Sequence, residues 1–162
     1  MQSNIVLCVD DDSTVLNALR IVLGKVLGSD VAVEIAGSGQ EALIVCAELE
    51  AEGRGVSVVI SDFLMPNMRG DELLVQIHEQ YPHTITIMLT GQSDLAGVKR
   101  AINEANLYRF LEKPFNNADL VLTVRSALKS FNQNKEQSET IEVLQRRIAE
   151  LESQLGATVN QP

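Results

Sequence analysis

The sequence has little of several features that mark particular classes of protein. It has no tryptophan, only 4% aromatic residues and only two cysteines. No apolar stretch reaches the roughly 18 residues that a membrane-spanning helix needs, and no charged-then-apolar leader opens the chain. Cys8 and Cys46 lie in an apolar run and a helical pattern, so we expect two core residues and no disulfide. These absences predict a soluble protein of the reducing cytoplasm, with no membrane partner.

Positive charge is also scarce. Lys and Arg number 13 against 22 Asp and Glu, which gives a net charge of -9. Such a field repels a phosphate backbone, and Arg146-Arg147 is too small a basic patch to offset it. We therefore expect no direct binding to nucleic acid. The length of 162 residues, 45% of them hydrophobic, suits one full core with an appendage.

Five short aliphatic runs alternate with five helical patterns. The first run is apolar at every position, as expected of a strand buried on both faces of a parallel sheet. The second and fifth runs are more mixed and predict less buried strands. The runs are residues 5–9, 31–35, 56–60, 84–89 and 108–111. Strict alternation predicts an α/β fold of the (βα)5 type, with a doubly wound, five-stranded parallel sheet.

Helix start signals support this alternation. Ser38 with Glu41 three residues later is a capping box. Asp12 is expected to favour the start of the first helix, at Ser13, rather than to bind a metal. The helix that opens at Ser93 or Asp94 is expected to turn three apolar side chains inward, and these are Val98, Ala101 and Ile102.

The character of the chain changes after residue 130. Residues 1–130 form the predicted domain, and 131–155 are a predicted helical extension in which nine polar residues precede an apolar stripe. The stripe has the spacing of a short coiled coil, and it consists of Ile141, Leu144, Ile148, Leu151 and Leu155. Residues 141–155 could pair two copies of the chain; the alternative is a solvated tail with an accidental stripe. Residues 156–162 are expected to be disordered.

Polar side chains fall where strands end. Asp10 and Asp11 follow the first strand, Asp62 the third, Thr90 the fourth and Lys113 the fifth. The ends of parallel strands line one crevice in a doubly wound sheet, so these groups should converge. Two carboxylates about 4 Å apart repel by roughly 4 kcal/mol at an effective dielectric near 20, so the cluster needs a cation.

Mg²⁺ suits this cluster because it prefers oxygen ligands and can leave a position open to a phosphoryl oxygen. In that setting Lys113 adds positive charge and Thr90 a hydroxyl donor, which is the equipment of phosphoryl transfer. No GxxxxGK[ST], GxGxxG or CxxC motif points to another cofactor.

Four motifs together resemble the response-regulator receiver family over residues 4 to about 130. They are Asp10-Asp11, Asp62-Phe63-Leu64-Met65-Pro66 with Gly70 downstream, Leu89-Thr90, and Phe110-Leu111-Glu112-Lys113-Pro114-Phe115. The resemblance implies a flavodoxin-like fold and a two-component signalling protein that is not an enzyme in its own right. It also implies a sensor histidine kinase or phosphotransfer protein as partner.

The resemblance implies roles for individual residues. Asp62 would be the phosphoacceptor, while Thr90 and Lys113 would hold the phosphoryl oxygens. Mg²⁺ would be bound by Asp11, Asp62 and the Leu64 backbone carbonyl, with Asp10 acting through water. Phe110 stands at the aromatic switch position, although it could instead be a simple core aromatic. The Lys113-Pro114 bond would be cis.

Two positions depart from the family pattern. Leu64 and Gln92 occupy the places whose side chains flank the path of the hydrolytic water, and we hypothesise that apolar Leu64 slows loss of the phosphoryl group. Leu64 also argues against a haloacid-dehalogenase type of phosphatase, which needs an acid there. A pseudo-receiver that is never phosphorylated would be expected to lack one of the key residues.

The output is left open by the sequence. The receiver could switch a dimer through its C-terminal helix. Alternatively, the chain could be a fragment of a longer regulator with an output enzyme domain, such as one of cyclic-dinucleotide metabolism.

Overall fold

The computed structural model describes residues 3–91 and 94–159, and the chain divides into two compact units, Met1–Phe131 and Asn132–Pro162. Strands and helices alternate without exception along the described residues. The strands are β1 (Asn4–Val9), β2 (Val31–Ala36), β3 (Val58–Asp62), β4 (Ile85–Thr90) and β5 (Arg109–Glu112). The helices are α1 (Ser13–Val26), α2 (Gly39–Ala51), α3 (Gly70–Gln80), α4 (Leu95–Glu104) and α5 (Asn117–Val159).

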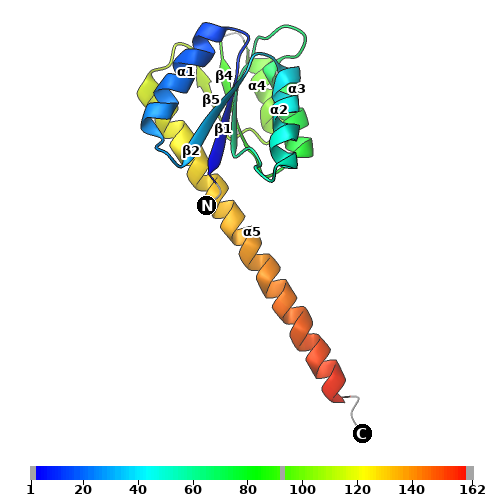
Figure 1. Ribbon diagram of the computed structural model, residues 1–162. Helices are drawn as coiled ribbons and strands as arrows, with labels where there is room; N and C mark the ends of the chain where they lie inside the picture. Colours follow the sequence, from blue (N-terminus) through cyan, green and yellow to red (C-terminus); the bar gives the residue numbers. More distant parts are fainter. Residues whose placement is uncertain (1–2, 92–93, 160–162) are drawn as a thin grey trace. The chain divides into compact units, whose positions relative to one another are not determined.

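The five strands form one parallel sheet in the order β2-β1-β3-β4-β5 (Figure 1). This confirms the doubly wound (βα)5 prediction and places the switch in strand order between β1 and β3. The edge strands β2 and β5 are mostly half-buried or exposed, whereas every residue of β3 is buried. The mixed composition of the second and fifth runs therefore reflected their edge positions.

Helices cover both faces of the sheet (Figure 1). Ile5, Leu7 and Val9 of β1 pack in the cluster that includes α2, α3 and α4 side chains. Val6 and Cys8 pack in the cluster on the other face, with α1 and the first turns of α5. Successive side chains of β1 thus pack into two cores on opposite faces of the sheet, which is why the strand is apolar throughout. Burial raises the pKa of the Cys8 thiol to about 12, as suits a core residue.

Helix caps follow the sequence signals with one shift. Ser38 Oγ accepts a hydrogen bond from Glu41 N at 3.1 Å, and the Glu41 carboxylate accepts one from Gly37 N at 2.8 Å. In a usual capping box the N–H of Ser38 itself would donate to Glu41, so the bond here comes from the residue before the cap. At α1 the cap is Asp12, whose Oδ1 accepts from Thr14 N at 2.9 Å.

Two expectations were wrong. Ile102 is 51% exposed, because α4 turns Val98 and Ala101 toward the core and the next position points away. The disorder expected from Gly156 is not found in 156–159, since α5 continues to Val159. One helical glycine costs only about 1 kcal/mol, which the continuing helix can absorb at Gly156. Residues 160–162 lie outside the described ranges.

The second unit is the rest of α5, and its residues up to Val159 are almost all exposed. None of the helices in residues 3–91 and 94–159 carries a stretch apolar enough to span a bilayer.

Gly70 fixes how closely α3 approaches the end of β3. Its N–H donates to Phe63 O at 2.8 Å, and a Cβ placed there would collide with the Asp62 carbonyl oxygen. Gly24, inside α1, has nothing within 4 Å of the same added atom.

We predict opposite effects for alanine at these two glycines. Gly70→Ala should lower the free energy of unfolding by about 1–3 kcal/mol, because backbone must move to make room. Gly24→Ala should raise it by about 0.5–1 kcal/mol, because alanine loses less entropy in a helix. Urea denaturation of both variants checks this; a neutral Gly70→Ala would show that the loop after β3 is not tightly held.

Candidate functional site

The predicted acidic residues meet at the carboxyl ends of the central strands. Asp10 and Asp11 follow β1, Asp62 ends β3, and the two strands pair in register with Val9 opposite Ser61. The parallel pairing therefore brings both strand ends to the same edge of the sheet. One carboxylate oxygen from each of Asp10, Asp11 and Asp62 lies within 4.8 Å of the others. This is a geometry that one ion could bridge.

Lys113 reaches into the same group. Its Nζ lies 2.6 Å from Asp62 Oδ1, and its backbone N–H donates to Thr90 O at 2.8 Å. The Lys113-Pro114 peptide bond is cis, as the family resemblance implied. Thr90 ends β4 and is buried, with only 2% of its surface exposed. The hydroxyl residue thus ends β4 and the lysine directly follows the adjacent strand β5, both at the acidic edge.

The Asp10 carboxylate is the most confined of the three. Its Oδ1 accepts a hydrogen bond from Asp12 N at 2.9 Å. Within the part of the chain that the structure describes, its Oδ2 is buried without a hydrogen-bond partner. Burial raises the pKa of Asp10, and the Asp62 and Asp11 charges raise it further against the opposing effects of the Asp12 N–H and Lys113. An unpartnered buried oxygen beside two other carboxylates fits a hard divalent cation such as Mg²⁺.

Three of the remaining predicted positions, Phe110, Leu64 and Asp12, lie at the surface. Phe110 is 47% exposed on the edge strand β5, so the interpretation as a core aromatic is wrong. Leu64 is 64% exposed in the loop after β3. Gln92 lies outside the described residues. Asp12 serves as the α1 cap, in agreement with its predicted role.

One group of residues around the site was not predicted. The Phe63 ring lies beneath α4, where a Cβ on Gly97 would collide with it, and the Arg69 guanidinium stacks 5.5 Å from its centroid. Arg69 also binds Asp71 through Nε–Oδ1 at 3.1 Å and Nη2–Oδ2 at 3.0 Å.

Asp71 itself is completely buried and also lies 3.6 Å from Arg100 Nη1 of α4. Phe63, which follows the candidate phosphoacceptor, therefore packs against α4. Arg69, which lies over the Phe63 ring, is also joined to α4 through the charge of Asp71. The sequence signal was only an acid in the first turn of a helix, which is common on surfaces.

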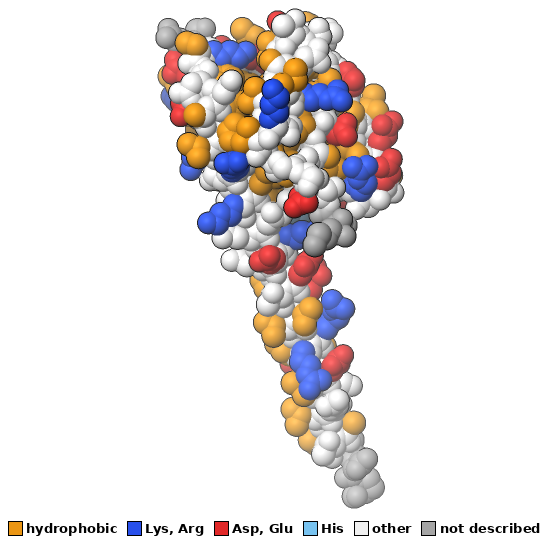
Figure 2. Space-filling model, turned by 60° about the vertical axis from the view of Figure 1, so that its left-hand side comes forward, with side chains coloured by type: hydrophobic (Ala, Val, Ile, Leu, Met, Phe, Trp, Pro, Cys, Tyr) orange, Lys and Arg blue, Asp and Glu red, His pale blue; other side chains and the backbone are white. Residues whose placement is uncertain are grey.

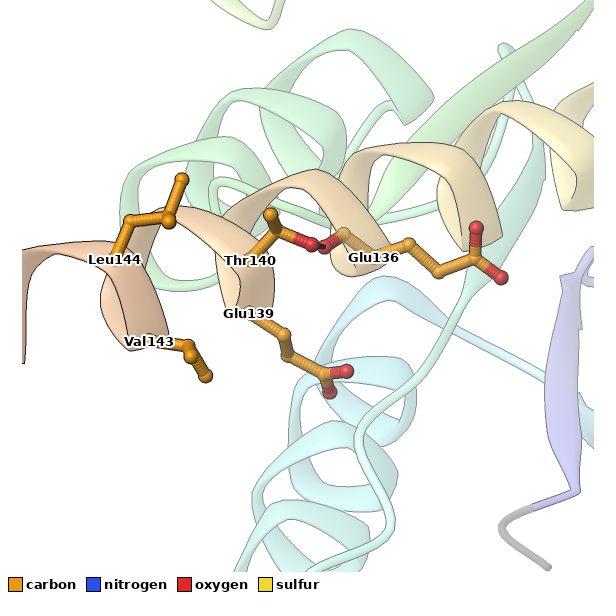
Figure 3. A pocket seen from close by; sticks show the side chains of 5 residues that line it. All are labelled: Glu136, Glu139, Thr140, Val143 and Leu144. Atoms are coloured by element: carbon orange, nitrogen blue, oxygen red, sulfur yellow. Dashed lines mark hydrogen bonds between the residues drawn. The ribbon is translucent and has the colours of Figure 1, made fainter. Parts of the chain in front are cut away.

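A shallow hollow in the second unit is unrelated to this site (Figure 3). It is lined by Glu136, Glu139, Thr140, Val143 and Leu144. Because all five belong to successive turns of one helix, the hollow is a gap between neighbouring side chains. It offers no convergent set of polar groups for a small ligand.

Comparison with known proteins identifies the family that the chain resembles. The family model described as "Response regulator receiver domain" matches residues 6–125. The hydrogenase transcriptional regulatory protein HoxA of Cupriavidus necator is 30% identical over 125 residues, covering 77% of this chain and 24% of that protein. The DNA-binding transcriptional regulator NtrC of Salmonella typhimurium is 33% identical over 144 residues, covering 88% of this chain and 28% of that protein.

A solved structure shows the same fold. The signal receiver domain of an HD domain-containing protein from Pseudomonas fluorescens is 34% identical, with a TM-score of 0.73, and covers 84% of this chain and 94% of that one. The chain spans only about a quarter of the length of the two curated relatives.

The crowding of carboxylates predicts that the free energy of unfolding of the metal-free protein depends on pH. Because the folded pKa of Asp10 is raised, ionising it disfavours folding as pH rises above its ordinary value of 3.8. Asp10→Asn should therefore melt at a higher temperature than the wild type at pH 7 in the presence of chelator. The difference should vanish below the ordinary pKa, where the wild-type carboxyl is neutral in both states.

Melting curves from pH 3 to pH 8 measure this. Asp30→Asn, at an exposed position, is the matched control and should follow the wild type. An Asp10→Asn variant less stable than the wild type at neutral pH would contradict the expectation.

Proposed function

We propose a function from one established premise: the chain belongs to the response regulator receiver family, whose members are signalling domains rather than conventional enzymes. Asp62 accepts a phosphoryl group from a phosphohistidine on a sensor histidine kinase or phosphotransfer protein. The carrying observation is the 2.6 Å contact of Lys113 Nζ with Asp62 Oδ1 inside a group of three carboxylates. That arrangement presents a nucleophilic oxygen next to a fixed positive charge.

The reaction is a direct transfer. A carboxylate oxygen of Asp62 attacks the phosphorus, the P–O bond forms, and the P–N bond breaks with its electron pair returning to the imidazole. Lys113 is placed to neutralise charge on the transferring oxygens, which is the main task of a protein in phosphoryl transfer. The Thr90 hydroxyl would donate to another of those oxygens.

The acidic group fits Mg²⁺. Asp11 and Asp62 would bind it directly together with the Leu64 backbone carbonyl, and Asp10 would act through water. When bound, Mg²⁺ supplies charge that shields an incoming phosphoryl group from the carboxylates. The buried, unpartnered Asp10 Oδ2 supports this assignment, because an oxygen of that kind needs a partner and a metal-bound water would supply one.

Phe110 is the proposed switch residue. Its ring is half exposed on the edge strand, whereas Thr90 is buried at the end of the adjacent strand. Movement of the Thr90 hydroxyl toward a phosphoryl group would leave space into which the ring could turn. This would change the surface of α4, β5 and α5, and the output would follow through the C-terminal helix, with residues 141–155 as a dimer contact.

The output is a separate proposal. The chain covers about a quarter of the length of its transcriptional relatives, so a regulator that also carries an output domain, such as an enzyme, is compatible with everything described. No observation favours a pseudo-receiver, since Asp10, Asp11, Asp62, Thr90 and Lys113 are all present.

The first test is covalent labelling. In the presence of Mg²⁺ and a small phosphodonor, the wild type should gain a phosphoryl group and Asp62→Asn should fall to background. Asp30→Asn should label normally, because its side chain is exposed and away from the acidic group. Uptake by Asp62→Asn at the wild-type rate would refute the assignment.

The same labelling experiment tests metal binding with two matched variants. Asp11→Asn should need at least about tenfold more Mg²⁺ for half-maximal labelling, because a ligand is lost. Asp12→Asn should keep the wild-type dependence, since asparagine caps a helix as well as aspartate does. Labelling that survives chelation would contradict a metal at this site.

Leu64 is proposed to prolong the phosphorylated state. Its exposed side chain stands two residues beyond Asp62, where it would disfavour a water lined up for hydrolysis.

We predict that Leu64→Asn loses its phosphoryl group faster than the wild type, because an amide can hold that water. Leu64→Met, which stays apolar, should decay at the wild-type rate. Decay is followed by the loss of radiolabel after removal of the donor. A slower Leu64→Asn would overturn the hypothesis.

A further inference from the structure

The second unit carries a row of exposed apolar side chains. Each of the five residues of the stripe is between 42% and 65% exposed, and they are Ile141, Leu144, Ile148, Leu151 and Leu155. Figure 2 shows hydrophobic side chains following one another along this helix. Val143 projects to a different side of the helix from Leu144 (Figure 3). A stripe of this kind is stable in water when a partner covers it.

We propose that the occupant is a second copy of this chain, paired parallel and in register as a two-stranded coiled coil. The inference rests on the homodimer part of the proposed function and gives it an orientation, a register and a number of strands.

The identity of the core residues indicates two parallel strands. With Ile141 as position a of the heptad, position a is filled by Ile, Ile and Leu, and position d by two Leu. β-Branched residues at a with Leu at d favour parallel dimers over trimers and tetramers. Continued toward the N-terminus, the repeat places Asn134 at a and Gln137 at d. A polar Asn at an a position restricts register and the number of strands.

Orientation changes which side chains meet. In the parallel register, each of the five apolar residues meets its own copy. Antiparallel pairing sets a against d of the other helix, so Leu144 would face Leu155 and Ile148 would face Leu151. Ile141 would then face Thr158, which puts a hydroxyl into two of the layers. The parallel arrangement instead keeps the five apolar layers free of hydroxyl groups, because Thr158 then meets its own copy in a separate layer.

The flanking charges agree with this orientation. Arg147 occupies g and Glu152 the following e, and these positions face each other between parallel helices. Each dimer would gain two such pairs. In the antiparallel register Arg147 would face Gln154, and Glu152 would face Gln145, so neither charge would be matched. Within one helix Arg147 contacts Glu150 at 3.3 Å, a weak exposed pair that leaves the guanidinium accessible.

Disulfide trapping tests the orientation directly. Cys8 and Cys46 are buried, so they leave the background clean under mild oxidation. Leu144→Cys alone should cross-link to itself, and so should Leu155→Cys alone. The antiparallel alternative predicts that neither does so, and that a mixture of the two variants forms a mixed disulfide. Ser153→Cys, at position f on the far side of the helix, is the control and should stay unlinked.

Charge exchange tests the register. Glu152→Arg should weaken the dimer about five- to tenfold in sedimentation equilibrium at low salt, because attraction becomes repulsion in both pairs. The double variant Arg147→Glu with Glu152→Arg should restore the wild-type affinity. Glu150→Gln removes only the contact within the helix and should have no effect.

Failure here is separable from failure of the phosphoacceptor proposal. A chain that stays monomeric at its highest soluble concentration, or cross-links only in the mixture, overturns the parallel coil even if Asp62 is labelled normally. Self-linked Leu144→Cys, with restoration by the double charge variant, supports it even if labelling fails.

Discussion

The structure depends on one electrostatic constraint, which is that three carboxylates are held together at the end of a rigid sheet. Their positions are set by β1 and β3, whose central residues are buried on both faces and cannot shift to relieve the repulsion. Lys113 offsets part of it through its contact with Asp62, and the proposed Mg²⁺ would offset the rest.

The same constraint explains why the surroundings of Asp62 are built so tightly. The Asp62 carbonyl touches Gly70, and the neighbouring Phe63 ring fills the space beneath Gly97 of α4. Asp71 then links Arg69 to Arg100, so α3 and α4 share one buried charge. Packed interiors change between discrete arrangements rather than by gradual deformation. If Asp62 is phosphorylated as proposed, its new charge would lie next to these contacts with α4, in addition to any movement at Thr90 and Phe110.

The fold and the residues that meet at the site were predictable because both follow from strand ends. Alternation in the chain requires parallel strands, and parallel strands bring Asp10, Asp62 and Lys113 to one edge. Features that depend on packing between helices were not predictable. Asp71 gave the signal of a surface acid, although its two arginine partners lie on different elements. Ile102 matched the helical period but sits one step beyond the buried arc. At Gly156, a local breaker signal was outweighed by the propagation of an existing helix.

The helicity of residues 132–159 does not by itself demonstrate pairing. The expensive step in forming a helix is nucleation, and the first turns of α5 are already held by packing of Leu120, Val124 and Ala127. Extension then adds one hydrogen bond for each residue fixed. The argument for a partner comes from the side chains instead, because propagation is indifferent to where apolar residues fall, while this stripe keeps heptad spacing. A coil of about two heptads pairs only weakly. Weak pairing suits a switch, because a small difference between the phosphorylated and unphosphorylated receivers is enough to shift the balance between single and paired chains.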